Sequence, residues 1–550
     1  MNRPGTIKHW IIYALLVCGA VVFSFPFLWM VSTALKSDRE LYSGAIDLVP
    51  ERPDPRAQSP YFSPSEFPAL DEASPQARAL LPMLRQRVTD AANLPPAANR
   101  DEAARILSAG LFESLRQRTP PSIWDGDPDA LLRFAQADTT PDRVAAVAQR
   151  AHRQFGIGPI RARNVDLHEE ELSANVPPER RWNNQTPAVA TLSPAIEHTL
   201  PYAAVAYDFS RGDRVVLSQA FDLPFPADQL QRLTLRVRPD DTWHGLSVTV
   251  EAAGVRYVAE RAAPLAETGW LTLLYQKRSP DDYSTKIKKW LVLEETARSP
   301  QFDHGPNRIH VTLELRRATP ASAAYAKAQR NYYRVRDYIP FWRYVRVSVL
   351  LVVLNIVLTL LSSSLVAYAF ARLQWPGRNA LFIILLGTMM IPGQVTMIPH
   401  FLIWKSVGAF NTLTPLWAGA ALGNAFFIFL MRQFLKGIPT DLEDAARIDG
   451  CGFLRIWWHV MLPLVKPSLA AIAIFTFMAT WNDFLTPLIY IADQRLYPLA
   501  FGLYAFSVQV DNSPVLTMGA SLLMTIPVIA VFFAAQRYFI AGITLTGMKG

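Results

Sequence analysis

Six long apolar runs alternate with polar segments along the chain. They lie near residues 10–34, 346–371, 380–404, 412–435, 467–491 and 515–540. A helix needs about 20 predominantly apolar residues to cross the hydrocarbon core of a bilayer, and each run is long enough. The pattern therefore predicts six membrane-spanning helices.

The polar segment 37–344 separates the first run from the second. In its first part, residues 64–156, apolar positions recur at helical spacing, and Ser-Pro and Thr-Pro pairs at Ser74 and Thr140 are typical helix starts. We predict helices over 75–92, 100–118 and 141–155.

The second part of this segment, residues 202–317, has the alternation of a half-buried sheet. Leu233, Leu235 and Val237 alternate with polar neighbours, and the pattern repeats from Ile309 onwards. About eight such runs predict a small β-sandwich, for which a jelly roll is one arrangement. A helical stretch over 321–344 then leads into the second apolar run.

Composition supports a membrane protein. The 550 residues are 51% hydrophobic and only 18% charged, which is too apolar for a typical soluble chain of this size. We therefore expect a lipid bilayer around the chain and no nucleic-acid partner. The two cysteines, Cys18 and Cys451, lie outside segment 37–344, so that segment must depend on a hydrophobic core rather than on disulfides.

Lysine and arginine gather in alternate connecting segments. By the positive-inside rule these segments, both termini included, are predicted to be cytoplasmic, and segment 37–344 to lie outside the cytoplasm. The alternative for the first run, a cleaved signal peptide, is less favoured because the run is long and contains Pro26 and Trp29. The basic residues are Arg3, Lys8, Arg372, Arg378, Arg432, Lys436, Arg447, Arg455, Lys466, Arg537 and Lys549.

The cytoplasmic segment 436–466 carries the most distinctive motif, Asp441-Leu-Glu-Asp-Ala-Ala-Arg-Ile-Asp-Gly450. Thr440 and Glu443 have the spacing of a capping box, which predicts a helix start. Gly450 suits the left-handed residue that ends a helix. A second helical stretch is predicted to follow, before Leu462 and Pro463.

This motif resembles the "EAA" loop of ABC-importer permeases, in which a short cytoplasmic helix docks into a cleft on a separate ATPase. Residues 10–36 and 331–550 also resemble the carbohydrate, maltose-type branch of that family. The chain departs from the pattern at Asp444, where the family usually has Glu. The resemblance implies ATPase coupling by Leu442, Asp444, Ala445, Ala446, Gly450, Leu462 and Pro463.

Three further residues are candidates for the pathway or for packing. Asp483 lies within an apolar run beside Asn482, and an ionisable group there is costly unless it faces a polar interior or a partner. It could line the path or hydrogen-bond to protein, and we favour the structural role. Pro392 breaks the third run, and such breaks are tolerated where the backbone lines a cavity or neighbouring helices satisfy it.

The sequence has no Gly-rich phosphate loop ending in Lys-Ser/Thr, so ATP hydrolysis by that route requires another protein. We expect no catalytic residue, no metal and no cofactor on this chain, since ATP would be bound by the partner. The resemblance implies an ABC ATPase dimer, a second permease, similar or identical, and an extracytoplasmic solute-binding protein.

Taken together, the expected fold is a membrane all-α permease core of the ABC type I importer kind, with an inserted α+β extracytoplasmic domain. The core comprises residues 1–36 and 345–550. The resemblance implies a permease subunit in the inner membrane of a prokaryote that imports a carbohydrate by alternating access. It is not expected to be an enzyme.

The alternative is a membrane-anchored glycan-binding or sensor protein that signals through its outer domain. Four aromatic residues of the predicted sandwich could stack on sugar rings, although buried aromatics are also normal in sandwich cores. They are Trp243, Trp270, Trp290 and Tyr275. The sequence identifies neither the sugar nor the role of the insertion.

Overall fold

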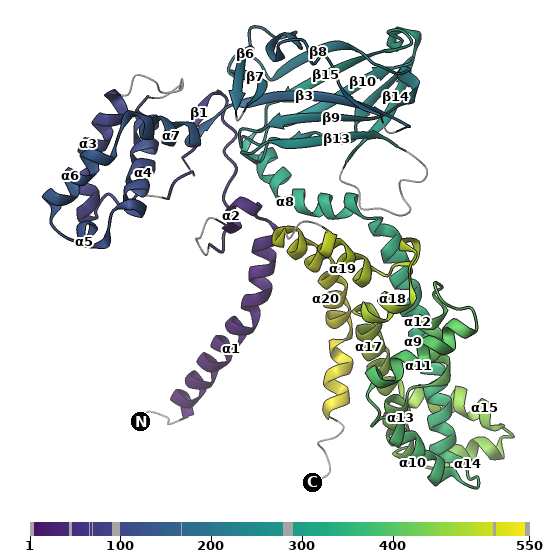
Figure 1. The fold of residues 1–550 in the computed structure, drawn as a ribbon. Helices are drawn as coiled ribbons and strands as arrows, with labels where there is room; N and C mark the ends of the chain where they lie inside the picture. The colour runs from purple at the N-terminus through teal and green to yellow at the C-terminus, as the bar shows by residue number, and fades with distance from the viewer. Residues whose placement is uncertain are drawn as a thin grey trace. The chain divides into compact units, whose positions relative to one another are not determined.

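The computed structural model describes residues 5–42, 47–64, 66–68, 70–90, 100–166, 168–197, 199–278, 290–509 and 513–544. Its contacts divide the chain into two compact units (Figure 1). The first takes the chain up to Glu51 and again from Gln329 onwards, and the second takes the described residues between Arg52 and Ala328. The second unit therefore lies within the predicted insertion, 37–344.

Among the described residues, four segments of the first unit are long and apolar enough to cross a membrane. They are Ile12–Ala34 in α1 (Gly5–Ala34), α9 (Phe341–Arg372), Thr414–Lys436, and Pro514–Gln536 in α20 (Pro514–Thr544). The third of these joins α12 (Thr414–Trp417), a 3₁₀ turn (Ala418–Leu422) and α13 (Ala425–Lys436). Six spans result only if two bent helix pairs each count as one. The prediction of six simple helices is therefore not confirmed.

The bends occur where the sequence interrupts a helix. Helices α10 (Arg378–Thr388) and α11 (Gly393–Ser406) meet at 99° around Pro392, which has extended backbone angles. In the second bent pair, the helical stretch Phe453–Leu464 meets α17 (Lys466–Trp481) at 83°. The predicted run 467–491 is itself divided between α17 and α18 (Leu485–Tyr490). The 16 residues of α17 extend about 24 Å, less than the hydrocarbon thickness of about 30 Å.

The remaining helices of the first unit are short, apart from α8, which begins in the second unit and continues into the first. Asn331 of α8 (Pro320–Tyr338) donates through Nδ2 to the carbonyl oxygens of Ala34, at 2.8 Å, and Lys36, at 2.9 Å. The two ends of the insertion are thereby joined. The others are α2 (Asp38–Tyr42), α14 (Asp441–Ile448), α15 (Phe453–Ile456), a π turn (Trp457–Met461), α16 (Leu462–Leu464), a 3₁₀ turn (Gln494–Leu496) and α19 (Leu499–Gln509).

The second unit begins with a helical part around its own core. Helices α3 (Pro75–Asp90), α4 (Arg100–Arg118) and α7 (Pro141–Ala151) correspond to the three predicted, and α5 (Pro121–Trp124) and α6 (Pro128–Asp138) were not predicted. Residues 91 and 92 lie outside the described residues. Helix α7 ends early because β2 (His152–Arg153) pairs with β1 (Tyr61–Phe62).

A sheet of thirteen strands follows within the described residues, along the path β5-β8-β15-β10-β11-β14-β13-β9-β3-β7-β6, with β12 and β4 at its sides. Strands begin at Phe155, well before the predicted residue 202. Their bounds are β3 Phe155–Asn164, β4 Glu169–Glu171, β5 Asn183–Asn184, β6 Ala190–Glu197, β7 Leu200–Tyr207, β8 Arg214–Asp222, β9 Leu230–Arg238, β10 Gly245–Ala252, β11 Val255–Ala259, β12 Ala263–Pro264, β13 Leu271–Lys277, β14 Leu291–Arg298 and β15 Arg308–Arg316.

The sheet folds over on itself and encloses a single core (Figure 1). We call this folded sheet, residues 155–316, the β-sandwich, although its strands form one continuous hydrogen-bonded sheet rather than two. Val250 and Val311, from β10 and β15, share this core with Leu235 and Ile157, from β9 and β3. The alternation predicted around Leu233 and Ile309 is confirmed. The parallel pairing of β13 with β14 departs from an all-antiparallel jelly roll.

Candidate coupling site

Helix α14 covers most of the distinctive motif. Its first turn is acidic, with Asp441, Glu443 and Asp444, and its last turn contains Arg447, so both ends match the helix dipole. Gly450 follows with φ of +79°, the left-handed conformation predicted for it. The motif therefore folds as a short helix with a glycine stop.

The predicted capping box does not form. Thr440 has helical backbone angles and its side chain makes no capping hydrogen bond. The carboxylate of Glu443 is buried instead, where its Oε1 accepts a hydrogen bond of 2.9 Å from the Tyr368 hydroxyl of α9. That contact takes the carboxylate away from the helix terminus.

Arg372, at the last turn of α9, completes this buried polar cluster. Its Nε lies 3.7 Å from Glu443 Oε2, and the two side chains are only 6% and 5% exposed. Its Nη2 donates to the carbonyl oxygen of Leu435, at 2.6 Å, and to that of Ile438. Through Arg372, Tyr368 and Glu443, three elements are joined: α9, the end of α13 and α14.

The other side of α14 is exposed. Leu442 is 45% exposed and Ile448 is 86% exposed, and Asp444 and Ala445 also face outward. The apolar surface continues along the start of α15 at Phe453 and Leu454. Grouped exposed apolar side chains of this kind mark interaction surfaces.

The predicted coupling residues thus divide between two faces. Leu442, Asp444, Ala445 and Gly450 are exposed, whereas Ala446 is half-buried against the core of the first unit. In the neighbouring α16, Leu462 packs partly against the same core and Pro463 is exposed. The exposed face can contact a partner while the inner face holds the helix.

The three pathway or packing candidates lie at helix breaks. Asn482 donates through Nδ2 to the carbonyl oxygen of Met478 at 2.8 Å, and Asp483 Oδ1 accepts from the backbone N–H of Thr486 at 3.0 Å. Asp483 therefore has a local structural partner at the start of α18. Pro392 lies at the bend between α10 and α11 and is exposed in the single chain.

The aromatic candidates of the sandwich are occupied by protein contacts. Tyr275 is fully buried and Trp243 nearly so, which excludes stacking of a sugar on either ring. The guanidinium of Arg236 lies 5.4 Å from the ring centre of Trp270, and Arg232 lies 5.3 Å from that of Trp290.

Sequence reasoning missed Tyr368 and Arg372, although a usable signal was present. The two residues are four apart at the end of an apolar run, and such a spacing places both side chains on one helix face. A polar pair there predicts a buried partner near the end of the helix.

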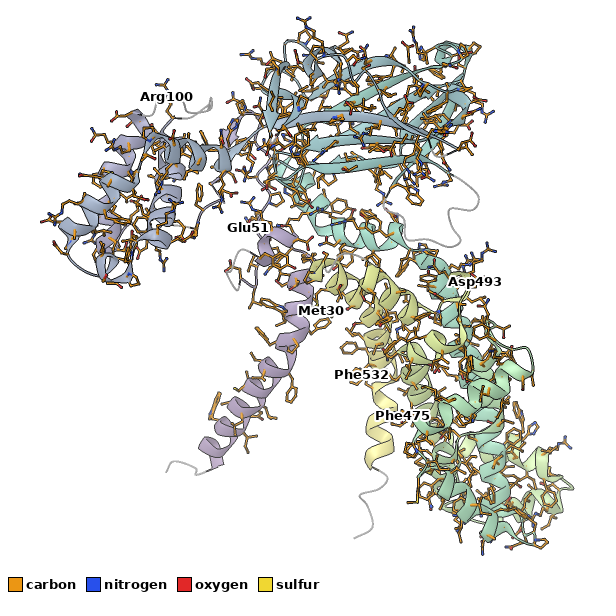
Figure 2. All side chains as sticks on the ribbon, viewed as in Figure 1. Met30, Glu51, Arg100, Phe475, Asp493 and Phe532 are labelled. Carbon is orange, nitrogen blue, oxygen red and sulfur yellow. The ribbon has the colours of Figure 1, made fainter. Side chains whose placement is uncertain are left out.

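Figure 2 draws the side chains of the described residues and shows those of α1, around the labelled Met30, pointing outward along much of the helix. Many of them are large, apolar and exposed, including Leu15, Val22 and Phe23. An apolar helix surface of this kind is suited to contact with lipid or with another protein.

Comparisons with known proteins match the first unit. Residues 360–544 match the family described as "Binding-protein-dependent transport system inner membrane component". The arabinooligosaccharides transport system permease protein AraQ of Halalkalibacterium halodurans is 37% identical over 210 residues, covering 38% of this chain and 75% of the relative. The melibiose/raffinose/stachyose import permease protein MelC of Bacillus subtilis is 32% identical over 195 residues, covering 35% of this chain and 71% of the relative.

Among solved structures, a chain of a bacterial ABC transporter involved in the import of the acidic polysaccharide alginate is similar. It is 29% identical, and the match covers 38% of this chain and 79% of that chain, with a TM-score of 0.34. The family match contains the whole of segment 436–466 and does not extend into the second unit.

Proposed function

The chain belongs to the family of binding-protein-dependent transport system inner membrane components, and we propose that it is the permease subunit of an ATP-driven importer. Its relatives are named transport permeases, so the chain is a multi-pass transport subunit rather than an enzyme.

The proposed substrate is a carbohydrate, an oligosaccharide or a similar polar solute. Support comes from the names of two relatives, whose substrates are arabinooligosaccharides in one case and melibiose, raffinose and stachyose in the other. The substrate pathway would lie among the membrane helices, where Asp483 and Pro392 remain candidates for the lining or for packing.

The proposed partners are an ABC ATPase dimer, a second permease and an extracytoplasmic solute-binding protein. The family name itself includes dependence on a binding protein. In this arrangement both termini and segment 436–466 are cytoplasmic, and the second unit lies outside the inner membrane. ATP is bound by the partner.

The observation that carries the proposal is the two-sided character of α14. Its outer face presents exposed apolar residues, which would dock on the ATPase, and its inner face is anchored by Glu443 to Tyr368 and Arg372 of α9. Closure of the ATPase dimer would displace α14, and α9 would follow it because the buried cluster joins them. Docking contacts that differ between two global states can bias a remote gate in this way.

The alternative of a membrane-anchored sensor is not favoured. The matched relatives are named as transport permeases, and the burial of Tyr275 and Trp243 removes two of the four aromatics proposed to stack on a glycan.

Purification of the tagged chain from its native membrane, with co-purifying proteins identified by mass spectrometry, tests the proposal. An ATPase and a second permease should accompany the wild type. Ile448→Arg should lose the ATPase and keep the second permease. Ile196→Arg, at an exposed position of the sheet, is the matched control and should keep both. Absence of an ATPase from the wild type in mild detergent would contradict the proposal.

A further inference from the structure

We propose that Glu251, His304 and His310 form a binding site for a divalent transition-metal ion on the outer face of the β-sandwich. The proposal is independent of transport. It concerns the second unit, whereas from the sequence we expected no metal anywhere on this chain.

The strand pairing brings two of the three ligands together. Glu251 of β10 lies directly opposite His310 of β15 in the antiparallel register. Their neighbours Val250 and Val311 point into the core, so Glu251 and His310 point to the opposite, outer face of the sheet. This placement follows from the backbone and requires no rearrangement of the sheet.

The third ligand comes from the turn before β15. His304 follows the 3₁₀ turn Pro300–Phe302, and its Nε2 lies 2.8 Å from Glu251 Oε2. Nδ1 of His310 lies 4.0 Å from the same oxygen, and one possible ligand atom from each residue lies within 4.8 Å of the others. Ligands around tetrahedral Zn²⁺, at bond lengths of about 2.1 Å, are separated by about 3.4 Å. Small side-chain rotations would therefore suffice.

Arg256 fixes the carboxylate for this role. Its Nε and Nη2 contact Glu251 Oε1, at 2.9 Å and 2.7 Å, and its guanidinium lies 4.2 Å from the ring centre of Phe302. Oε2 is thus directed toward the two histidines. A hydrogen-bonded carboxylate of this kind is typical of metal sites, where surrounding contacts orient the ligands.

The ligand set selects the class of ion. Two imidazoles and one carboxylate suit Zn²⁺ and related first-row metals, whereas Ca²⁺ and Mg²⁺ prefer oxygen ligands. The His304 and His310 side chains are 26% and 29% exposed, so water can take the remaining coordination position. A bound ion would tie the turn at residues 303–305 to the sheet.

The test uses the full chain, purified in detergent with a tag free of histidine and treated with a chelator. Zn²⁺ is then titrated, and the bound metal is measured after removal of excess. At low free Zn²⁺ the wild type should bind one equivalent more than His304→Ala, His310→Ala or Glu251→Gln. In each variant the affinity of this site should be at least about tenfold weaker. His168→Ala, at an exposed histidine elsewhere on the sheet unit, should bind as the wild type does.

Thermal unfolding provides the second measurement. Zn²⁺ should raise the unfolding temperature of the wild type and not that of Glu251→Gln, because an ion that binds only the folded state stabilises it. Glu251→Gln keeps the shape of the side chain, so a loss of Zn²⁺ binding in this variant can be distinguished from a failure to fold. The proposal is overturned if the wild type binds no additional Zn²⁺, or if Glu251→Gln binds it as tightly as the wild type; a hydrogen-bonded Glu-His pair would then be the whole role of the cluster.

Discussion

Helix α14 and the β-sandwich are held in place by opposite means. The sandwich is fixed by a continuous apolar core, with Leu235, Val250 and Val311 fully buried. Helix α14 has eight residues and a single buried side chain, the carboxylate of Glu443. A helix of this length is not stable alone, so its position depends on its tertiary contacts.

The difference in how the two regions are held determines how readily each can move. A packed core resists displacement because many contacts would be lost at once. A helix anchored through one polar cluster moves together with whatever holds that cluster, here α9 and the end of α13. The chain therefore combines a stably packed β-sheet body with a short helix whose position is linked to α9 and α13.

Removal of the Glu443 carboxylate is expected to have the largest effect. Glu443→Ala leaves the Arg372 guanidinium buried without its acid, and breaking a buried pair costs about 3–5 kcal/mol. The unfolding temperature of the purified chain should fall clearly. Asp441→Ala, on the exposed first turn of the same helix, is the control and should have little effect; equal effects of the two would contradict the anchoring role.

A cavity in the core of the β-sandwich should destabilise the second unit without affecting α14. Leu235→Ala removes a fully buried side chain from β9 and should cost about 2–5 kcal/mol. Limited proteolysis should then cut the second unit faster, while recovery of the ATPase stays unchanged. Loss of the ATPase from this variant would show that the regions are not independent.

Acid should weaken the second unit through His152. Burial, with help from Arg238 and Arg153, lowers the pKa of His152 to about 4. The unfolded chain, with a pKa of about 6.5, binds the proton more readily. The contribution of neutral His152 to the free energy of unfolding is therefore fully present above pH 6.5. It decreases by about 3 kcal/mol as the pH falls toward 4. Unfolding temperatures measured over this range should fall less for His152→Gln than for the wild type, whereas His168→Gln should match the wild type.

Loss of the Tyr368 hydroxyl should have the smallest effect on stability. Tyr368→Phe keeps the ring and removes one hydrogen bond to a charged group, worth about 2 kcal/mol. Thermal unfolding measures the loss. Tyr504→Phe, at an exposed tyrosine of the same unit, should leave the unfolding temperature unchanged.

Local patterns predicted much of this architecture. The apolar runs, the alternation around Leu233 and the left-handed Gly450 depend on neighbouring residues, which the sequence displays directly. The early strands were missed because β3 contains Gly156, Gly158 and Pro159, which interrupt the alternation. The break at Pro392 was visible in the sequence, but its angle of 99° was not.

The coupling site shows where local patterns are insufficient. The spacing of Thr440 and Glu443 favours a capping box, yet Glu443 turns inward to Tyr368, which lies 75 residues earlier in the chain. Only the tertiary structure brings that hydroxyl and Arg372 to the helix. The histidines of the proposed metal site are likewise 53 and 59 residues from Glu251. Residues this far apart in the sequence do not form a short motif that could be recognised.

The most direct test of the account is Glu443→Gln in a complex reconstituted into vesicles, with ATP hydrolysis and sugar uptake measured together. Gln leaves the outer face of α14 intact, so the ATPase should still bind and hydrolyse ATP. Uptake should fall strongly because α14 is no longer held to Arg372 by charge. Unchanged uptake by this variant, with the protein folded and the ATPase bound, would contradict the claim that the buried cluster transmits the movement.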